Sequence, residues 1–129
     1  MNIDNLFGIH ENALNLRIKR AEVLASNLAN ADTPGYKAKD MDFNDVLKDI
    51  SSNQSKGMMT TNPAHIANST YNADVPLMYR EPLQTSLDGN TVDTQIESAK
   101  LAENNMRLLA SLRIMDMKIK SFTTALRGE

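Results

Sequence analysis

The sequence predicts a mainly helical protein, in which long N- and C-terminal helices pair as an antiparallel, coiled-coil-like hairpin beside a flexible or partly extended middle segment. Three observations predict this fold. Apolar residues recur at helical spacing over residues 5–30, and again over residues 91–127. The segment between them is polar, and Pro63, Pro76 and Pro82 discourage long helices there. With 129 residues the chain is long enough for one domain.

Two sets of apolar residues lie about 100° apart on the first predicted helix and give it a wide apolar stripe. The sets are Phe7, Leu14, Ile18, Ala21, Ala25 and Leu28, and Leu6, Ile9, Ala13, Leu16 and Val23. The Asp-Thr-Pro-Gly sequence at residues 32–35 should end the helix, because proline and glycine interrupt helical geometry. We therefore assign residues 1–31 to the N-terminal helix.

Two apolar seams run along the last predicted helix and lie about 160° apart, on nearly opposite sides. One seam is Leu101, Leu108, Leu112, Met115, Ile119, Phe122 and Leu126, and the other is Ile96, Ala99, Met106, Ala110 and Met117. Thr94 and Glu97 have the spacing of a capping box, and Gly128 suits the helix end. We interpret the carboxylates of this helix, Glu97 included, as solvated. Residues 91–129 form the C-terminal helix.

The middle part covers residues 32–90. After the turn we expect a short helix over residues 42–50 and a flexible Ser-rich connector over residues 51–57. Short extended pieces are expected within residues 75–87, because proline restricts the residue before it to extended geometry.

This layout leaves one apolar seam without a cover. When the two long helices pack on each other, each buries one apolar seam of the other. The middle segment is too polar to cover much of the opposite seam on the last helix. An uncovered seam favours contact with other protein chains. A three- or four-helix bundle, in which the middle folds over that seam, fits the same pattern.

Composition removes most enzyme chemistry. The chain has no cysteine, which excludes disulfides, thiol catalysis and cysteine metal sites. His10 and His65 are the only histidines, and Leu14 stands one turn after His10, where a helical metal site would need a second ligand. The scattered glycines form no phosphate-binding loop, and a net charge of −2 gives no strong field for nucleic acid. We therefore expect no enzyme activity, no cofactor, no metal and no nucleic-acid partner.

The first residues lack the features of a secretory signal. Residues 1–16 contain no Lys or Arg, and polar residues interrupt their apolar positions. We therefore expect no cleaved signal peptide and no direct membrane insertion. Composition alone favours a cytoplasmic protein over one exported by a route that leaves the N-terminus uncut.

The most specific segment spans the end of the first helix and the turn after it. Asn27 and Asn30 place two amides on one helix face, where a polar break can fix register with a partner. Pro34 and Gly35 suit the two middle positions of a type II turn, after which Tyr36 can pack back on the helix. An ordinary helix end followed by a turn is the simpler interpretation of the same residues.

This segment resembles the N-terminal signature shared by bacterial flagellar rod and hook proteins. The residues that carry the resemblance are Asn27, Leu28, Ala29, Asn30, Ala31, Asp32, Thr33, Pro34, Gly35, Tyr36 and Lys37. Within that family, residues 38–43 and 86–93 resemble the proximal type of rod subunit. The length and the two terminal helices agree, so the resemblance extends over the whole chain in its organisation.

The resemblance implies a structural subunit of the flagellar basal body rather than an enzyme. Such subunits are exported by the flagellar type III system without signal cleavage, and they assemble helically into the rod, the drive shaft that transmits torque across the periplasm. The implied partners are other rod proteins, like subunits, the adaptor that joins the rod to the MS ring, and the export gate. The implied location is the basal body, after synthesis in the cytoplasm.

Two sets of site residues follow from these expectations. Phe43 and Leu47 fit a short element read by the export gate, and a short amphipathic helix explains their spacing equally well. Assembly packing is expected to use Phe7, Leu14, Ile18, Leu28, Leu108, Leu112, Met115, Met117, Ile119 and Phe122. The middle segment would order only against neighbouring subunits. The alternative function is a soluble cytoplasmic helical adaptor or type III secretion chaperone, which would form a closed dimer and stay folded alone.

Overall fold

The computed structural model of the chain describes residues 3–54, 75–84 and 86–128. The elements follow in the order α1 (Ile3–Ala29), β1 (Lys39–Asp40), α2 (Phe43–Gln54), β2 (Met78–Tyr79) and α3 (Thr94–Arg127). The prediction of a mainly helical chain with long helices toward both ends is confirmed.

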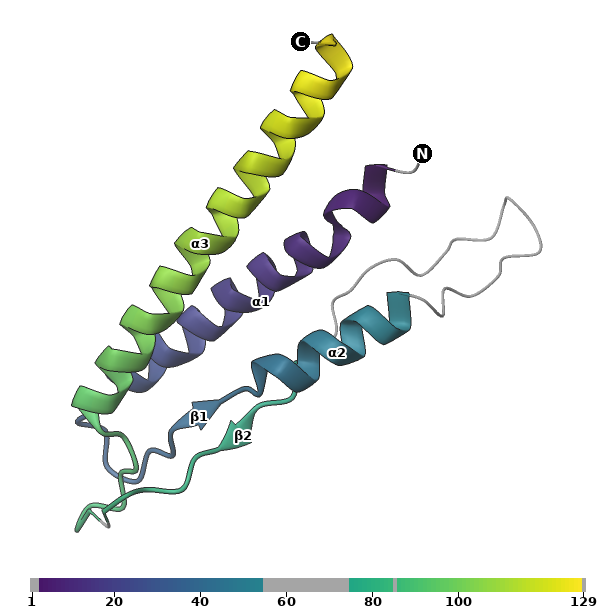
Figure 1. Cartoon of the computed structure of the whole chain (residues 1–129). Coiled ribbons are helices and arrows are strands. Elements are labelled where there is room, and N and C mark those ends of the chain that lie inside the picture. Colours follow the sequence, from purple (N-terminus) through teal and green to yellow (C-terminus); the bar gives the residue numbers. More distant parts are fainter. Residues whose placement is uncertain (1–2, 55–74, 85, 129) are drawn as a thin grey trace.

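The two long helices lie side by side and run in opposite directions, so both chain ends lie at the same end of the pair (Figure 1). α1 and α3 are close where α1 ends and α3 begins, and they separate toward the termini (Figure 1). The buried side chains of α3, Glu97 and Asn104, lie in the first third of this 34-residue helix. The predicted antiparallel hairpin is confirmed, and its tightest contact is at the end away from the termini.

The buried face of α1 follows the second predicted apolar set, to which Leu16 belongs. Leu16 and Leu24 are 2% and 0% exposed, and the neighbouring Asn27 is also fully buried. By contrast, Ile9 and Ile18, one from each set, are exposed. Leu24 belongs to neither predicted set. It is buried because α1 is covered on two sides, by α3 and by α2 with β1, and spacing alone does not show this second cover.

The short helix of the middle part is α2, and it packs on α1 (Figure 1). Asp42 caps its start, since the Asp42 carboxylate accepts the backbone N–H groups of Asn44 at 2.9 Å and Asp45 at 3.1 Å. The helix then runs four residues beyond the predicted end at residue 50. The small apolar core of the chain consists of Leu16, Met41, Val46 and Ile50.

The caps of α3 differ from the prediction at one end. Asp93 is the capping residue, with extended backbone, and its carboxylate accepts the N–H groups of Gln95 at 3.0 Å and Ile96 at 3.2 Å. The prediction that Thr94 caps the helix is therefore wrong, and a charged carboxylate also interacts better with the helix dipole than a hydroxyl does. Gly128 ends the helix in the left-handed conformation, as predicted.

Two short strands join the middle part to the helix pair. β1 and β2 are antiparallel, with Lys39 opposite Tyr79 and Asp40 opposite Met78. The extended geometry predicted within residues 75–87 is confirmed for β2, whereas β1 carried no recognisable strand pattern. Residues 51–54 of the predicted flexible connector belong to α2 instead, and residues 55–57 lie outside the described residues.

Candidate assembly interface

The signature segment forms a joint with residues 86–93 at the end of the helix pair where α1 stops and α3 begins. Asn27 lies at its centre. The Asn27 Nδ2 donates to the Lys39 carbonyl at 2.7 Å and to Glu97 Oε2 at 3.1 Å. The Asn27 Oδ1 accepts the Lys39 N–H at 3.1 Å and the Tyr36 hydroxyl at 3.3 Å. One amide therefore connects α1 with the turn, with β1 and with α3.

The predicted register role of the two asparagines is filled within this chain. The four hydrogen bonds just described occupy both the donor and the acceptor groups of the Asn27 amide. A buried amide of this kind favours one arrangement of the helices, because any other arrangement would leave its polar atoms without partners. Asn30 acts more locally: its Nδ2 donates to the Ser26 carbonyl at 2.8 Å, and its Oδ1 accepts the Thr33 hydroxyl at 3.2 Å. Asn27 thus fixes how the long helices meet, and Asn30 shapes the end of α1.

The turn after α1 has the predicted type II geometry. The Tyr36 N–H donates to the Thr33 carbonyl at 3.3 Å, and Gly35, at the third position of the turn, has a φ of +72°. Glycine suits this position because a side chain is strained at positive φ. The predicted return of Tyr36 onto α1 is confirmed by its hydrogen bond to Asn27.

Asn90 closes the exposed end of α1 from a distant part of the sequence. Its Nδ2 lies within hydrogen-bond distance of the carbonyls of Asn30 at 3.0 Å, Ala31 at 2.7 Å and Thr33 at 3.0 Å. The Asn90 Oδ1 accepts the Val92 N–H at 2.8 Å, two residues before α3 begins. Asn90 therefore satisfies carbonyls that the end of a helix leaves unpaired, and it links the end of α1 to the approach to α3.

Backbone hydrogen bonds join the two segments of the joint, and each segment has a glycine at positive φ. The Gly35 N–H donates to the Asp88 carbonyl at 2.9 Å, and the Thr91 N–H donates to the Tyr36 carbonyl at 3.0 Å. Gly89 also has a positive φ, of +75°, and a Cβ added there would lie 3.8 Å from the Gly35 Cα. The two regions that carry the family resemblance are thus direct structural partners, which spacing in the sequence did not show.

A charged network surrounds Asp40 beside the joint. Arg20 from α1 holds the Asp40 carboxylate with two hydrogen bonds, of 3.0 and 3.2 Å, and Arg80 adds a bond of 2.6 Å. Arg80 also pairs with Glu97, whose side chain is 1% exposed. Burial alone would raise the pKa of the Asp40 carboxyl, but the bonds from Arg20, from the Met41 N–H and from Arg80 outweigh burial and hold that pKa below its usual value.

This network corrects two interpretations of the sequence. Glu97 is not solvated, because Asn27 of α1 and Arg80, the residue after β2, supply donors that make burial of its carboxylate tolerable. Residues 75–84 and 86–90 are held by their own chain, so the expectation that the middle orders only against neighbours is wrong for these residues. Residues 55–74 lie outside the described part.

A second buried polar residue joins the long helices farther along α3. Asn104 is 1% exposed, and its Nδ2 donates to the Arg17 carbonyl at 2.9 Å. Sequence reasoning missed both Asn104 and Glu97 as interior residues. A signal was present, since they are seven residues apart and alternate with Leu101 and Leu108 at the spacing of a helix seam.

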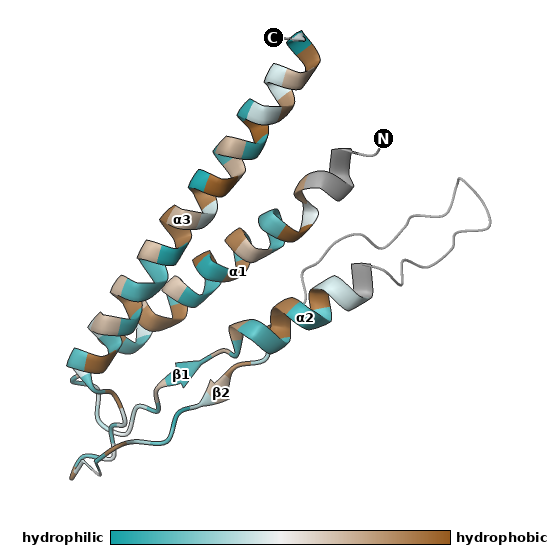
Figure 2. Cartoon of the chain, viewed as in Figure 1, coloured by the Kyte–Doolittle hydropathy of each residue, from teal (hydrophilic) through white to brown (hydrophobic). Residues whose placement is uncertain are grey.

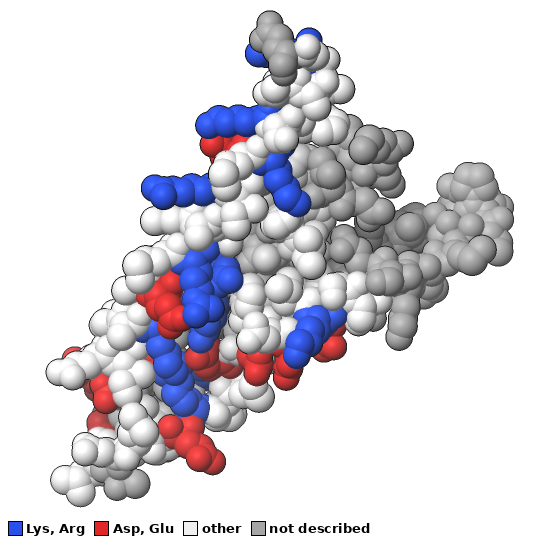
Figure 3. Space-filling view, viewed as in Figure 1, with Lys and Arg blue, Asp and Glu red and all other residues white. Residues whose placement is uncertain are grey.

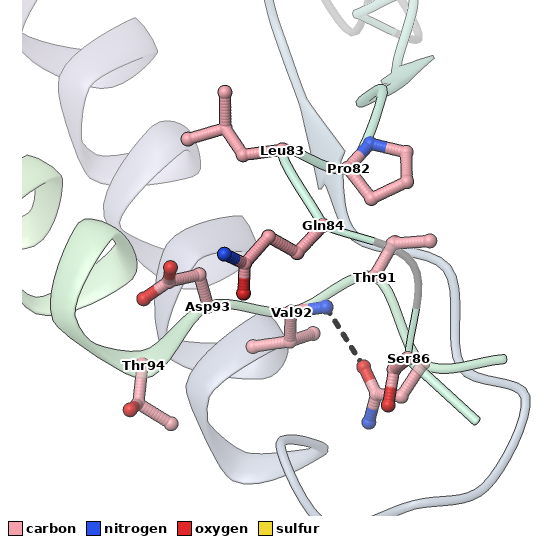
Figure 4. A pocket seen from close by; sticks show the side chains of 9 residues that line it. Pro82, Leu83, Gln84, Ser86, Thr91, Val92, Asp93 and Thr94 are labelled. Atoms are coloured by element: carbon pink, nitrogen blue, oxygen red, sulfur yellow. Dashed lines mark hydrogen bonds between the residues drawn. The ribbon is translucent and has the colours of Figure 1, made fainter. Parts of the chain in front are cut away.

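An open pocket of about 370 Å³ lies between residues 82–86 and the approach to α3 (Figure 4). Its lining is mainly polar, and the Leu83 side chain at its edge is highly exposed. The single titratable side chain among its described lining residues is Asp93, which already caps α3. This pocket therefore offers no acid–base pair, and its geometry is that of a groove beside the joint.

Apolar residues recur along α3 beyond Asn104, as the brown segments of that part of the helix show (Figure 2), and many of their side chains are exposed. The exposed large residues are Met106, Leu109, Leu112, Ile114, Met117, Ile119 and Leu126. We call this set the α3 apolar surface. Met106, Leu109 and Met117 are 66%, 60% and 59% exposed.

The two predicted seams of α3 separate in the structure. Leu108, Met115 and Phe122 of the first seam are half-buried, whereas Leu112 and Ile119 of the same seam are exposed. Met106, Ala99, Ala110 and Met117 of the second seam are all exposed, and Ile96 is half-buried. On α1, the candidate packing residues Phe7, Leu14 and Leu28 are half-buried, and Ile18 is exposed. The first seam thus faces its own chain only in part, with Leu112 and Ile119 exposed, and the second seam is largely bare.

The alternative of a helical bundle does not describe the observed part of the chain. Within the described ranges α2 contacts α1 and not α3, and α1 is the element that packs against α3. The middle therefore leaves the second seam of α3 uncovered as far as the structure describes it.

Phe43 and Leu47, the candidate export element, lie on α2 and are half-buried against the apolar core. The Arg17 guanidinium stacks over the Phe43 ring, 4.1 Å from its centre. α2 has the amphipathic character of the alternative explanation, so in the folded chain these two residues hold α2 onto α1.

Charged side chains of both signs are interleaved on the face shown in Figure 3, chiefly along α3 and beside the joint. Such mixing gives no single-sign surface on this face. Among the described residues, no group of three or more His, Asp or Glu side chains is placed to hold a metal ion. No helix in the described ranges has both the length and the apolar character of a membrane span.

The comparison with known proteins finds a family match that includes the signature segment of the joint. The family described as "Flagella basal body rod protein" matches residues 7–37. The flagellar basal body rod protein FlgB of Aeromonas hydrophila is 45% identical over the whole of this chain and 98% of its own length. The FlgB proteins of Proteus mirabilis (strain HI4320) and Salmonella typhimurium (strain LT2) are 39% and 38% identical, each over at least 96% of both chains.

The chain is therefore of the flagellar basal body rod protein class, a class defined here by paired long helices and the signature joint. Within that class it belongs to the FlgB family, since the similarity extends over essentially the full length of both chains.

Proposed function

We propose that this protein is a structural subunit of the proximal rod of the flagellar basal body, in which helices of neighbouring subunits cover the α3 apolar surface. One observation carries the proposal: seven large apolar side chains of α3 are exposed, while the Asn27 amide at the adjoining joint is fully hydrogen-bonded within the chain. An apolar area of this kind is unfavourable in water and is typical of a protein contact surface. The full-length similarity to FlgB proteins supports the same role.

The arrangement of exposed residues suits a helical assembly. Leu112 and Met117 belong to seams on different sides of α3, so one helix can contact two neighbours at once. A contact between unlike surfaces that does not close on itself produces a helical filament. The partners in this proposal are like subunits, other rod proteins and the adaptor that joins the rod to the MS ring. Torque is then carried by packed helices.

Export precedes assembly in this proposal. The protein is made in the cytoplasm and leaves through the flagellar type III system without signal cleavage, and Phe43 and Leu47 are read by the export gate. Because both side chains are half-buried on α2, the gate must read them before α2 docks on α1. Deleting residues 43–47 should reduce secretion while synthesis continues, whereas normal secretion of that variant would remove the export element from the proposal.

Locating the chain in isolated basal bodies tests the main proposal. A gold-binding tag fused after residue 129 should appear at the membrane-proximal end of the rod in electron micrographs. A tag found only in the cytoplasm, in cells whose basal bodies are complete, would contradict it.

A soluble helical adaptor or type III secretion chaperone is the competing function, and the internally satisfied joint favours a chain that folds alone. Circular dichroism separates the two. A rod subunit should show incomplete helicity that rises with protein concentration, because the open part of α3 lacks its cover. A fully helical monomer or closed dimer that melts sharply at low concentration would favour the adaptor.

A further inference from the structure

A second pocket, of about 220 Å³, lies where the two long helices meet the start of α2. Three arginines line it: Arg17 and Arg20 from α1, and Arg107 from α3. Asp42 and Asn44, at the start of α2, are also among its lining residues. We call it the arginine pocket. It brings three guanidinium groups together in a chain whose net charge is −2.

The carboxylates near the arginine pocket already have partners. Asp40 is held by Arg20, with its nearest contact at 3.0 Å, and Glu103 pairs with Arg107 at 2.5 Å. The Asp42 carboxylate is occupied by the N–H groups at the start of α2. Asp40 and Glu103 thus neutralise Arg20 and Arg107, two of the three arginines of the pocket, and Asp42 is occupied by backbone donors.

Arg17 is the third arginine of the pocket, and among the described residues no carboxylate forms an ion pair with it. Its Nε is buried and has no hydrogen-bond partner there. Burial, together with the nearby charges of Arg107 and Arg20, lowers the Arg17 pKa, which is the direction expected for a guanidinium that lacks a counter-ion. The Phe43 ring supports the guanidinium from one side, so the group is held in place and still has donors to offer.

We propose that the arginine pocket receives the carboxylate of an acidic side chain from a neighbouring subunit that docks on the α3 apolar surface. A guanidinium fork binds a carboxylate through two parallel hydrogen bonds. Arg107 lies on the same face of α3 as the exposed Ile114, seven residues farther along, so a subunit that covers this part of the α3 apolar surface comes within reach of the pocket. This inference rests on the proposed function and adds a charged contact to an otherwise apolar interface.

Titration of the purified full chain with a small carboxylate tests the chemistry of the pocket without any assembly. The probe is N-acetylglutamate amide, which carries one side-chain carboxylate, and the signals are the Arg17 Nε–H and the Asn44 backbone N–H in NMR spectra. Both should shift and saturate, and Arg17→Gln should weaken binding by on the order of tenfold. Arg113→Gln, an exposed arginine elsewhere on α3, should leave the titration unchanged.

Two further titrations identify which chemical group the pocket binds. Sodium chloride at equal ionic strength should produce no saturating shift, and Arg17→Lys should bind more weakly than the unchanged chain because lysine lacks the planar fork. Equal responses to chloride and to the carboxylate, or equal binding by Arg17→Gln, would overturn the proposal. So would saturation with inorganic phosphate alone, because the pocket would then select a different anion.

Swimming assays extend the test to the assembled structure. Arg17→Glu should abolish swimming, and a basic substitution at an acidic position of a neighbouring rod subunit should restore it. Normal swimming of Arg17→Glu would overturn the proposal. If the pocket fails both tests while the tagged chain still appears in the rod, the inference is wrong and the proposed function stands.

Discussion

The two ends of the helix pair differ in what they bury. At the joint and directly after it, three polar side chains are buried: Asn27, Asn90 and Glu97 are each at most 6% exposed. At the open end the large apolar side chains of α3 are exposed. The usual distribution of polar and apolar residues is thus reversed along one pair of helices.

The difference indicates that the two ends obtain their order from different sources. Hydrogen bonds are directional, so the satisfied amides and carboxylates of the joint select one angle between α1 and α3 within a single chain. Apolar burial is non-directional, and the described part of the chain does not supply it at the open end. The chain therefore determines its own shape at the joint, and in the proposed function a neighbouring subunit covers the open end.

The largest effect should come from charging the open end. Met117→Asp and, separately, Leu112→Asp should each abolish swimming, because each residue faces a different neighbour and a carboxylate cannot be buried there without a partner. Hydrogen exchange at the joint should stay unchanged, since both side chains are exposed in the single chain. Swimming in soft agar and counts of complete basal bodies provide the measurement.

Asn105→Asp, at an exposed polar position of the same helix, is the matched control and should swim. If only one of Leu112 and Met117 matters, packing on two sides of α3 is wrong.

The next effect should appear at the centre of the joint. Asn27→Ala removes four hydrogen bonds and leaves the Lys39 backbone groups and Glu97 short of partners, so the free energy of unfolding should fall by about 3 kcal/mol. Urea unfolding of the purified chain measures the loss. Asn15→Ala, at an exposed position of α1, should change stability by less than about 0.5 kcal/mol. Equal losses for the two variants would show that the joint is not the stable end.

A smaller effect is expected from the charged network and depends on pH. The Asp40 pKa is lowered in the folded chain from its usual 3.8. The stabilisation is therefore present above pH 3.8 and is lost as pH falls through the lower folded-state pKa. Asp40→Asn should reduce stability at pH 7 by about 1–2 kcal/mol and flatten the pH dependence below pH 4.

Unfolding by urea at pH 7, 5 and 3 measures this pH dependence. Asp49→Asn, at an exposed position of α2, should reproduce the unchanged chain at pH 7. A pH profile of Asp40→Asn that matches the unchanged chain would exclude Asp40 as the group responsible.

The smallest effect concerns the backbone of the turn. Gly35→Ala should cost about 1 kcal/mol, because a side chain is strained at positive φ, and no atom within 4 Å of the added Cβ contributes a clash. Gly128 also has a positive φ, of 73°, but it lies at the end of α3, where the backbone can relax around the side chain added by Gly128→Ala. This substitution should therefore cost less. Thermal melting of the two variants side by side decides the order.

The spacing of residues in the sequence was sufficient to predict the elements whose signals lie within a few neighbouring residues. The long helices follow from apolar periodicity, the turn from Pro34 and Gly35, and α2 from a short amphipathic pattern after Asp42. The bare side of α3 also follows, because two seams on opposite sides cannot both be covered by one partner helix. These features depend on residues that are close in sequence.

The joint depends on long-range contacts, and for that reason it was not predictable from spacing. Asn90 reaches carbonyls about 60 residues away, and Arg80 bridges Asp40 and Glu97 from separate elements. Strands of two residues are too short for a period to appear. Glu97 was interpreted as solvated because a carboxylate is usually exposed, and only the approach of Arg80 and Asn27 makes its burial tolerable.

The clamp formed by Asn90 gives the pair a preferred direction of opening. Since one side chain joins the last carbonyls of α1 to the approach to α3, neither helix can loosen at this point without disturbing the other. Amide protection against solvent exchange should therefore decline steadily from the clamp toward the two termini. A force that pulls the termini apart would separate the loosely packed turns first and reach the clamp last, so a strained subunit would keep the angle at which its helices meet.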